Sequence, residues 1–91
     1  MGGRVVWDKG NWPKCAKYGV SKAEIEYVLA APATVIFGDP YEVEERFRAI
    51  GKTEAGRYVF VAFAVRDDQI RPISARYMHA KEIRRYVEDR R

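Results

Sequence analysis

The chain has 91 residues and a formal net charge of +4. Its length is enough for one packed core and hardly for two, so we expect a single domain over residues 1–91. Its one cysteine, Cys15, excludes an internal disulfide and a zinc site built from several thiols. The longest apolar run, Tyr58–Val65, is too short for a membrane-spanning helix. These features favour a bacterial-type cytoplasmic protein that is not bound to a membrane.

The positive charge gathers at the two ends of the chain. Residues 1–20 hold four basic side chains and one acidic one, and residues 66–91 hold eight basic and five acidic ones. If the two ends meet in the fold, they form a basic face that attracts phosphate groups. The alternative is a solvated charged surface that binds no nucleic acid.

The first third of the chain predicts a strand and two helices. Arg4–Trp7 is rich in β-branched and aromatic residues, as strands are. A helix then begins near Trp12 and runs to about Tyr18. Ser21–Glu24 has the pattern of a capping box, which opens a second helix that ends before Pro32.

The rest of the chain predicts strands and a final helix. An acidic loop at Tyr41–Glu45 separates a strand over Ala33–Phe37 from three strands that form an antiparallel meander. These three strands are Arg46–Ile50, Tyr58–Val65 and Ile70–Arg76, and a helix over about Ala80–Asp89 follows them. Because Tyr58–Val65 is apolar on both sides of the pleat, we expect both of its faces to be covered. The predicted fold class is α+β, an antiparallel sheet of about four to five strands with two N-terminal helices and one C-terminal helix.

Four groups of residues then occur in a characteristic order. They are Val6-Trp7-Asp8, Lys17-Tyr18-Gly19-Val20-Ser21, Glu45-Arg46 with Ala49-Ile50-Gly51, and Ile70-Arg71-Pro72-Ile73-Ser74-Ala75-Arg76 followed by Glu82 and Tyr86. In order and spacing they resemble the BrnT family, the toxins of bacterial type II toxin–antitoxin pairs, over about residues 5–87. The segment Ile73–Arg76, with the glutamate and tyrosine that follow it, is the most specific part of this resemblance.

The resemblance implies a fold similar to that of RelE-type ribonuclease toxins and an endoribonuclease activity that arrests translation. It also implies a BrnA-like antitoxin with a ribbon-helix-helix domain as the partner, beside the RNA substrate. One position departs from the family pattern, because Tyr18 stands where the family usually has a histidine. A tyrosine is a poor base near neutral pH. A second hypothesis therefore stays open, a non-catalytic toxin-like module that binds an antitoxin or nucleic acid.

RNA can be cleaved through its own 2′-hydroxyl group, so such an enzyme needs positive charge at the phosphate and a proton donor or acceptor, but neither a metal ion nor a cofactor. Arginine presents a planar fork of N–H donors that suits a phosphate, and histidine titrates near neutral pH. The candidate catalytic residues are Arg46, Arg71, Arg76 and His79.

The geometry of a regular strand poses a difficulty for these candidates. Arg71 and Arg76 are five residues apart, so they point to opposite faces unless Pro72 marks a bulge or Arg76 lies beyond the strand end. The alternative role for each arginine is a surface or interface ion pair, for example with Glu44, Glu45 or Glu82.

Lysines and aromatic residues near the arginines are candidates for binding the RNA strand, because lysines neutralise phosphates and aromatic rings stack on unpaired bases. These candidates are Lys14, Lys17, Trp12, Tyr18 and Lys81. Trp7 is expected in the core instead, and Cys15 is expected to be half-buried and without a redox role.

Overall fold

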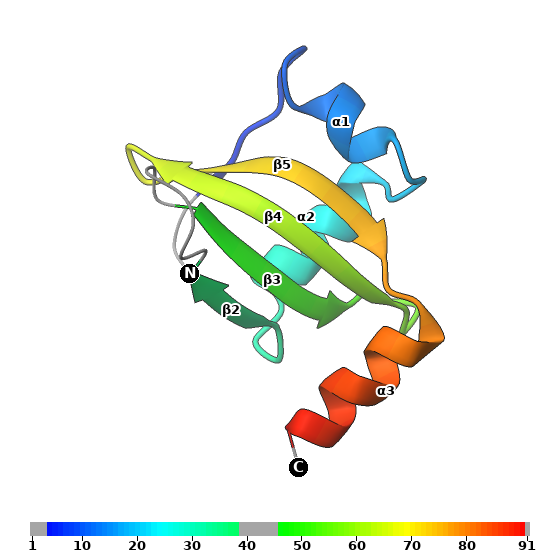
Figure 1. The fold of residues 1–91 in the computed structure, drawn as a ribbon. Coiled ribbons are helices and arrows are strands. Elements are labelled where there is room, and N and C mark those ends of the chain that lie inside the picture. Colours follow the sequence, from blue (N-terminus) through cyan, green and yellow to red (C-terminus); the bar gives the residue numbers. More distant parts are fainter. Residues whose placement is uncertain (1–3, 39–45, 91) are drawn as a thin grey trace.

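The sheet in this computed structural model has five strands, in the order β1-β5-β4-β3-β2 (Figure 1). The structure describes residues 4–38 and 46–90. The elements in chain order are β1 (Arg4–Val5), α1 (Trp12–Ala16), α2 (Lys22–Ala30), β2 (Val35–Gly38), β3 (Arg46–Lys52), β4 (Tyr58–Arg66), β5 (Gln69–Tyr77) and α3 (Ala80–Asp89). This arrangement confirms the predicted α+β class, with helices α1 and α2 before the main strands and α3 after them.

The pairing of the first strand differs from the prediction. Strands β2 to β5 pair antiparallel, but β1 pairs parallel to β5, so the sheet is mixed. The predicted strand Arg4–Trp7 is also shortened to two residues. Beyond it the backbone turns toward α1, and the Asn11 side chain holds this turn by accepting from the Asp8 N–H at 2.8 Å and donating to the Val6 carbonyl at 3.0 Å. The predicted loop Tyr41–Glu45 lies outside the described residues.

Local signals set the starts of the two longer helices. The Ser21 hydroxyl accepts from the Glu24 N–H at 3.1 Å, and the Glu24 carboxylate accepts from the Ser21 N–H at 2.9 Å. The predicted capping box is therefore present at the start of α2. Helix α3 has the predicted bounds, with His79 as its N-cap residue.

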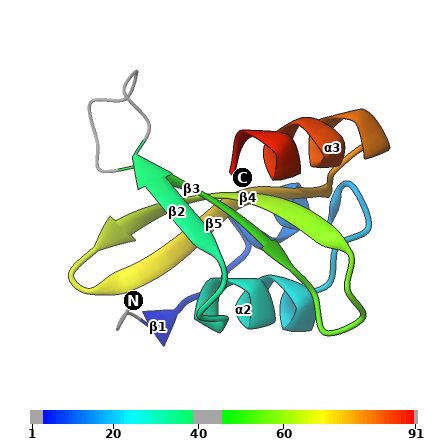
Figure 2. The same ribbon diagram turned by 90° about the horizontal axis from the view of Figure 1, so that it is seen from below.

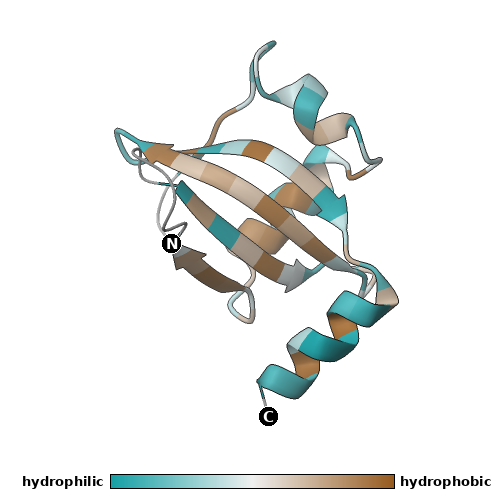
Figure 3. Cartoon of the chain, viewed as in Figure 1, coloured by the Kyte–Doolittle hydropathy of each residue, from teal (hydrophilic) through white to brown (hydrophobic). Residues whose placement is uncertain are grey.

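Helices α2 and α3 lie on opposite sides of the sheet (Figure 2). None of the residues of α3 is buried, and its ribbon is mostly hydrophilic with a few hydrophobic bands (Figure 3). Its ring contact with the sheet joins Tyr86 to Tyr58 at the start of β4, with the ring centroids 6.0 Å apart. Helix α3 therefore touches its side of the sheet near one end.

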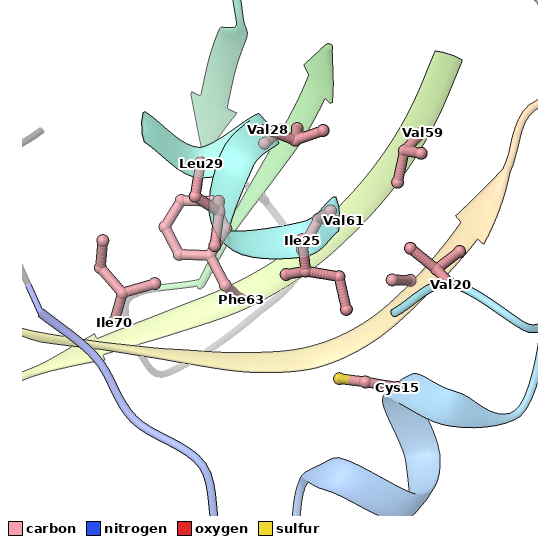
Figure 4. Packing of buried hydrophobic residues seen from close by; sticks show 11 residues of the cluster. Cys15, Val20, Ile25, Val28, Leu29, Val59, Val61, Phe63 and Ile70 are labelled. Carbon is pink, nitrogen blue, oxygen red and sulfur yellow. The ribbon is translucent and has the colours of Figure 1, made fainter. Parts of the chain in front are cut away.

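The core lies between α2 and the other side of the sheet, which we call the covered face (Figure 4). Three alternate residues of β4, Val59, Val61 and Phe63, are fully buried there. From α2, Ile25 and Val28 pack into the same cluster and are also fully buried. At about 25 cal/mol per Å² of apolar surface, such side chains supply most of the stability of a domain this small.

Two predictions of burial were wrong. Cys15 is fully buried in the core cluster, not half-buried, because α1 packs against β5 and its thiol points toward the core (Figure 4). The segment Tyr58–Val65 was expected to be covered on both faces. On its second face Phe60 and Ala62 are only half-buried, since α3 leaves part of that face uncovered.

Candidate functional site

A bulge in β5 decides which side chains share a face of the sheet. Ala62 of β4 pairs with Ser74, but the next residue of β4, Phe63, pairs with Pro72, so Ile73 is the extra residue. One inserted residue exchanges the two faces for everything that precedes it on the strand. Arg71 and Arg76 therefore point to the same side of the sheet, which removes the difficulty raised by their spacing.

The face opposite the covered face carries three cross-strand rows of side chains, and we call it the arginine face. In antiparallel strands, residues directly opposite each other point to the same side. The rows are Arg46, Ala64 and Arg71; then Phe37, Arg48, Ala62 and Ser74; then Val35, Ile50, Phe60 and Arg76. Arg46 and Arg48 share this face because they are two apart on one strand. The small side chain of Ala64 leaves room between Arg46 and Arg71, and that of Ala62 leaves room beside Arg48.

A pocket of about 190 Å³ opens where the first of these rows meets the start of α1. It is lined by Gly10, Asn11, Lys14, Arg46, Ala64, Arg66, Arg71, Pro72 and Ile73. Four of these residues are cationic, and none of them is acidic. The hydrogen bond to Asp8 raises the pKa of Arg71, and the nearby positive charge of Arg66 opposes this rise. Like charges held this close attract an anion to the space between them.

Asp8 holds Arg71 at the edge of this pocket. The two Nη atoms of Arg71 donate to the two carboxylate oxygens of Asp8, with 3.1 Å between Nη2 and Oδ1. The same Oδ1 also accepts from the backbone N–H groups of Gly10 at 2.7 Å and Asn11 at 3.0 Å. The hydrogen bond from Arg71, followed by the bond from Gly10, lowers the pKa of Asp8 to about 2.

Glu82 holds Arg76 in a similar way at the other end of the arginine face. The Arg76 Nη atoms donate to the Glu82 carboxylate at 2.7 and 2.8 Å. The Glu82 Oε1 atom also accepts from the backbone N–H of His79 at 3.0 Å. The hydrogen bond from Arg76 is the main reason why the pKa of Glu82 falls to about 2. The ion pair that the sequence suggested for Arg76 is thus present.

Four further candidates, His79, Lys81, Tyr18 and Lys17, lie around this end of the face, whereas Lys14 lines the pocket at the other end. His79 is exposed at the start of α3, and Lys81 is exposed on its first turn. Tyr18 is 55% exposed on the turn after α1, with the Lys17 ammonium group 5.5 Å from its ring centre. Tyr18 is close enough to Arg76 to contribute to raising the pKa of that arginine, although Glu82 contributes most.

Trp12 lies apart from the pocket, among different neighbours. Its ring meets the Trp7 ring edge-on at 5.3 Å, and both rings pack against the core cluster. The ammonium group of Lys22 lies 4.8 Å from the Trp12 ring centre. Trp7 thus contacts the core, as the sequence predicts, and Trp12 shares its environment.

Two arginines of this region, Arg48 and Arg66, were not among the candidates predicted from the sequence. Arg48 lies two residues after Arg46, so the alternation of a strand is a signal for it. Arg66 ends β4 at the hairpin, and its place beside Arg71 follows only from the pairing of β4 with β5.

Comparison with known proteins places the chain in a family. The family model described as the ribonuclease toxin, BrnT, of a type II toxin–antitoxin system matches residues 7–82, which include every arginine of the arginine face. No curated protein matches the chain. In the part of the chain that the structure describes, no helix is long and apolar enough to span a membrane.

Proposed function

Since this chain belongs to the BrnT family of ribonuclease toxins of type II toxin–antitoxin systems, we propose that it cleaves RNA on its arginine face. The observation that carries the proposal is the bulge at Ile73, which brings Arg71 and Arg76 to one side of the sheet. Arg46 of β3 and Arg71 of β5 lie on either side of Ala64 of β4, so one short stretch of the sheet presents positive charge from the two strands that flank β4 and from α1.

The pocket suits the phosphate at which the RNA chain breaks. The 2′-oxygen attacks the neighbouring phosphorus and loses its proton, and the bond to the 5′-oxygen breaks as that oxygen gains a proton. Arg46, Arg71 and Lys14 stabilise the extra negative charge on the phosphate oxygens, which is usually the largest contribution to such catalysis. Because the nucleophile belongs to the substrate, we propose that the reaction needs no metal ion.

His79 lies beyond Arg76, and Phe60 opposite Arg76 is four residues along β4 from Ala64 opposite Arg71, which is about 13 Å. Because this exceeds hydrogen-bond reach of a phosphate in the pocket, we propose that His79 contacts the bound RNA strand beside the scissile phosphate and that water completes the proton transfers. Tyr18, which stands where the family usually has a histidine, lies near Arg76 and can donate a hydrogen bond. The exposed Lys17 and Lys81 are proposed to neutralise phosphates of the bound strand. No RNA-binding role is proposed for Trp12, because its ring packs with Trp7 against the core cluster.

In the cell, the proposed result of this cleavage in the cytoplasm is arrest of translation. The family implies an antitoxin, and we propose a BrnA-like protein with a ribbon-helix-helix domain. An acidic or helical segment of the antitoxin that buries Arg46 and Arg71 would inhibit by occlusion. Co-purification of the two chains, with loss of inhibition when that segment is removed, tests this part of the proposal.

Cleavage itself is tested with the purified chain and a labelled single-stranded RNA in buffer containing EDTA. We expect cleavage, and we expect Arg46→Ala to reduce its rate by about 10²- to 10³-fold, as when one preorganised donor to a transition-state oxyanion is removed. Arg84→Ala, which removes an exposed charge from α3, is the matched control and should leave the rate nearly unchanged. Equal rates for the two variants would contradict the proposed site.

A second candidate function is a non-catalytic module that binds an antitoxin or nucleic acid. Tyr18 favours it, because it lacks the basicity of the histidine usual in the family. This candidate predicts no cleavage at high protein concentration together with tight binding of the antitoxin. Cleavage that disappears in Arg46→Ala but not in Arg84→Ala would reject it.

A further inference from the structure

Arg71 and Arg76 are held by the same kind of arrangement, although they lie at opposite ends of the arginine face. In each pair both Nη atoms of the arginine donate to both oxygens of one carboxylate. In each pair the carboxylate is itself held by the backbone. Asp8 accepts from two amides of the turn before α1, and Glu82 accepts from the N-cap amide of α3.

We propose that Asp8 and Glu82 are positioning residues of the ribonuclease site, which fix the orientation of Arg71 and Arg76 before RNA binds. The inference rests on the proposed function and extends it to two carboxylates that do not touch the substrate. It assigns them a role in the reaction beyond that of surface ion pairs.

The anchoring to the backbone separates these pairs from ordinary surface ion pairs. Two long exposed side chains that meet only each other contribute little, because both lose rotational freedom. Here one oxygen of Asp8 is already held by two N–H groups within a tight turn, so the carboxylate is an ordered acceptor. An arginine that pairs with this carboxylate loses side-chain conformational entropy when the protein folds. The later binding of a phosphate therefore costs less conformational entropy.

Pairing with a carboxylate leaves donors for a phosphate. Each guanidinium carries five N–H groups, and the observed bonds are made by one Nη1 and one Nη2 donor. The Nε–H and the outer Nη–H groups stay available for a second bidentate partner, such as a phosphate. The carboxylate therefore need not leave when RNA binds.

The opposite role would be competition, in which Asp8 and Glu82 occupy the place of a phosphate and must be displaced by it. The two roles predict opposite results for Asp8→Asn and Glu82→Gln. Removing a competitor strengthens the binding of a phosphate chain, whereas removing a positioning group weakens it. Asp8→Asn keeps an oxygen that can accept from Gly10 and Asn11, so the turn before α1 should persist.

The first test observes the arginines directly and does not depend on cleavage. In NMR spectra of the nitrogen-15-labelled chain, a fork-paired guanidinium rotates slowly, so its Nη–H signals are resolved. We expect Asp8→Asn to merge the signals of Arg71 only, and Glu82→Gln those of Arg76 only. Unchanged signals in both variants would overturn the proposal.

The second test measures function with the same variants. We expect each to lower kcat/KM for a short RNA by up to about 10²-fold, the effect of a small misplacement of a catalytic group. Each should also weaken the binding of a single-stranded DNA oligonucleotide, which has no 2′-hydroxyl to react. Glu26→Gln is the control, because this carboxylate accepts from Trp7 at 3.3 Å and lies outside the site. Stronger DNA binding, or unchanged binding and turnover, would overturn the proposal.

The two tests also separate this inference from the proposed function. If the unaltered chain does not cleave RNA, the ribonuclease proposal fails for this chain. The NMR signals and the DNA affinity then still decide whether the carboxylates position the arginines. If the chain cleaves RNA but neither variant changes turnover, DNA affinity or the NMR signals, only the positioning role fails.

Discussion

The same three strands, β3 to β5, carry two faces of very different character. On the covered face, Val61 and Phe63 are fully buried under α2, and Phe47 stacks on Phe63 with ring centres 5.5 Å apart. On the arginine face, Ala64 lies between Arg46 and Arg71, and Ala62 lies between Arg48 and Ser74. Because successive side chains of a strand point to opposite faces, each strand contributes alternate residues to the core and to the site. Substitutions on the two faces should therefore have separable effects, on stability and on RNA cleavage.

The largest effect is expected from the loss of the central core side chain, Phe63. Phe63→Ala should reduce the free energy of unfolding by about 3–5 kcal/mol, because it leaves a cavity under α2. Phe37→Ala, on the arginine face, removes a ring that is 38% exposed and should cost much less. Thermal and urea unfolding of both variants measure the difference. Equal losses would show that the two faces do not differ in packing as described.

A smaller loss of stability is expected at Gly51 of β3, which packs closely against Thr34 in the segment after α2. A Cβ atom on Gly51 would lie 2.2 Å from Thr34 Oγ1, which donates to the Val28 carbonyl at 2.6 Å. Gly51→Ala should therefore destabilise by about 1–3 kcal/mol, as other overpacked sites do. Gly51→Ala combined with Thr34→Ala, which removes the clashing hydroxyl, should recover part of the loss if the clash is the cause.

The smallest effect concerns the pH dependence of the arginine face. The pKa values of Asp8 and Glu82 fall to about 2 from ordinary values of 3.8 and 4.5. Their pairs with the arginines therefore stabilise the fold fully above about pH 4.5, and this stabilisation is lost as the pH falls toward 2. Asp8→Asn and Glu82→Gln should each flatten the melting temperature profile between these pH values. If the melting temperature of either variant depended on pH as steeply as that of the parent chain, the stabilisation would not come from these two carboxylates.

Features that depend on neighbouring residues were predictable from the sequence. The capping box at Ser21 and Glu24 and the bounds of α3 follow from side chains within one helical turn, so no distant contact is needed to form them. The strands of the meander were predicted within a few residues for the same reason. The burial of Cys15 was not, because it depends on how α1 packs against β5.

The candidate site was predictable only in part. The arginines could be selected by residue type and by resemblance, but their common face could not, because a single bulge reverses the direction of half a strand. The partner of Arg71 is Asp8, 63 residues earlier in the chain, and that contact exists only once β1 and the start of α1 lie beside β5.

The sequence by itself thus determined the helices, the strands and the set of basic residues, since these follow from local propensity and from composition. The tertiary structure decided which of those residues face one another. The bulge at Ile73 and the docking of α1 bring Lys14, Arg46 and Arg71 around one pocket. The physical reason is that strand pairing and packing select among registers whose local energies are nearly equal, and burial of the apolar covered face favours the one in which the arginines remain in contact with solvent.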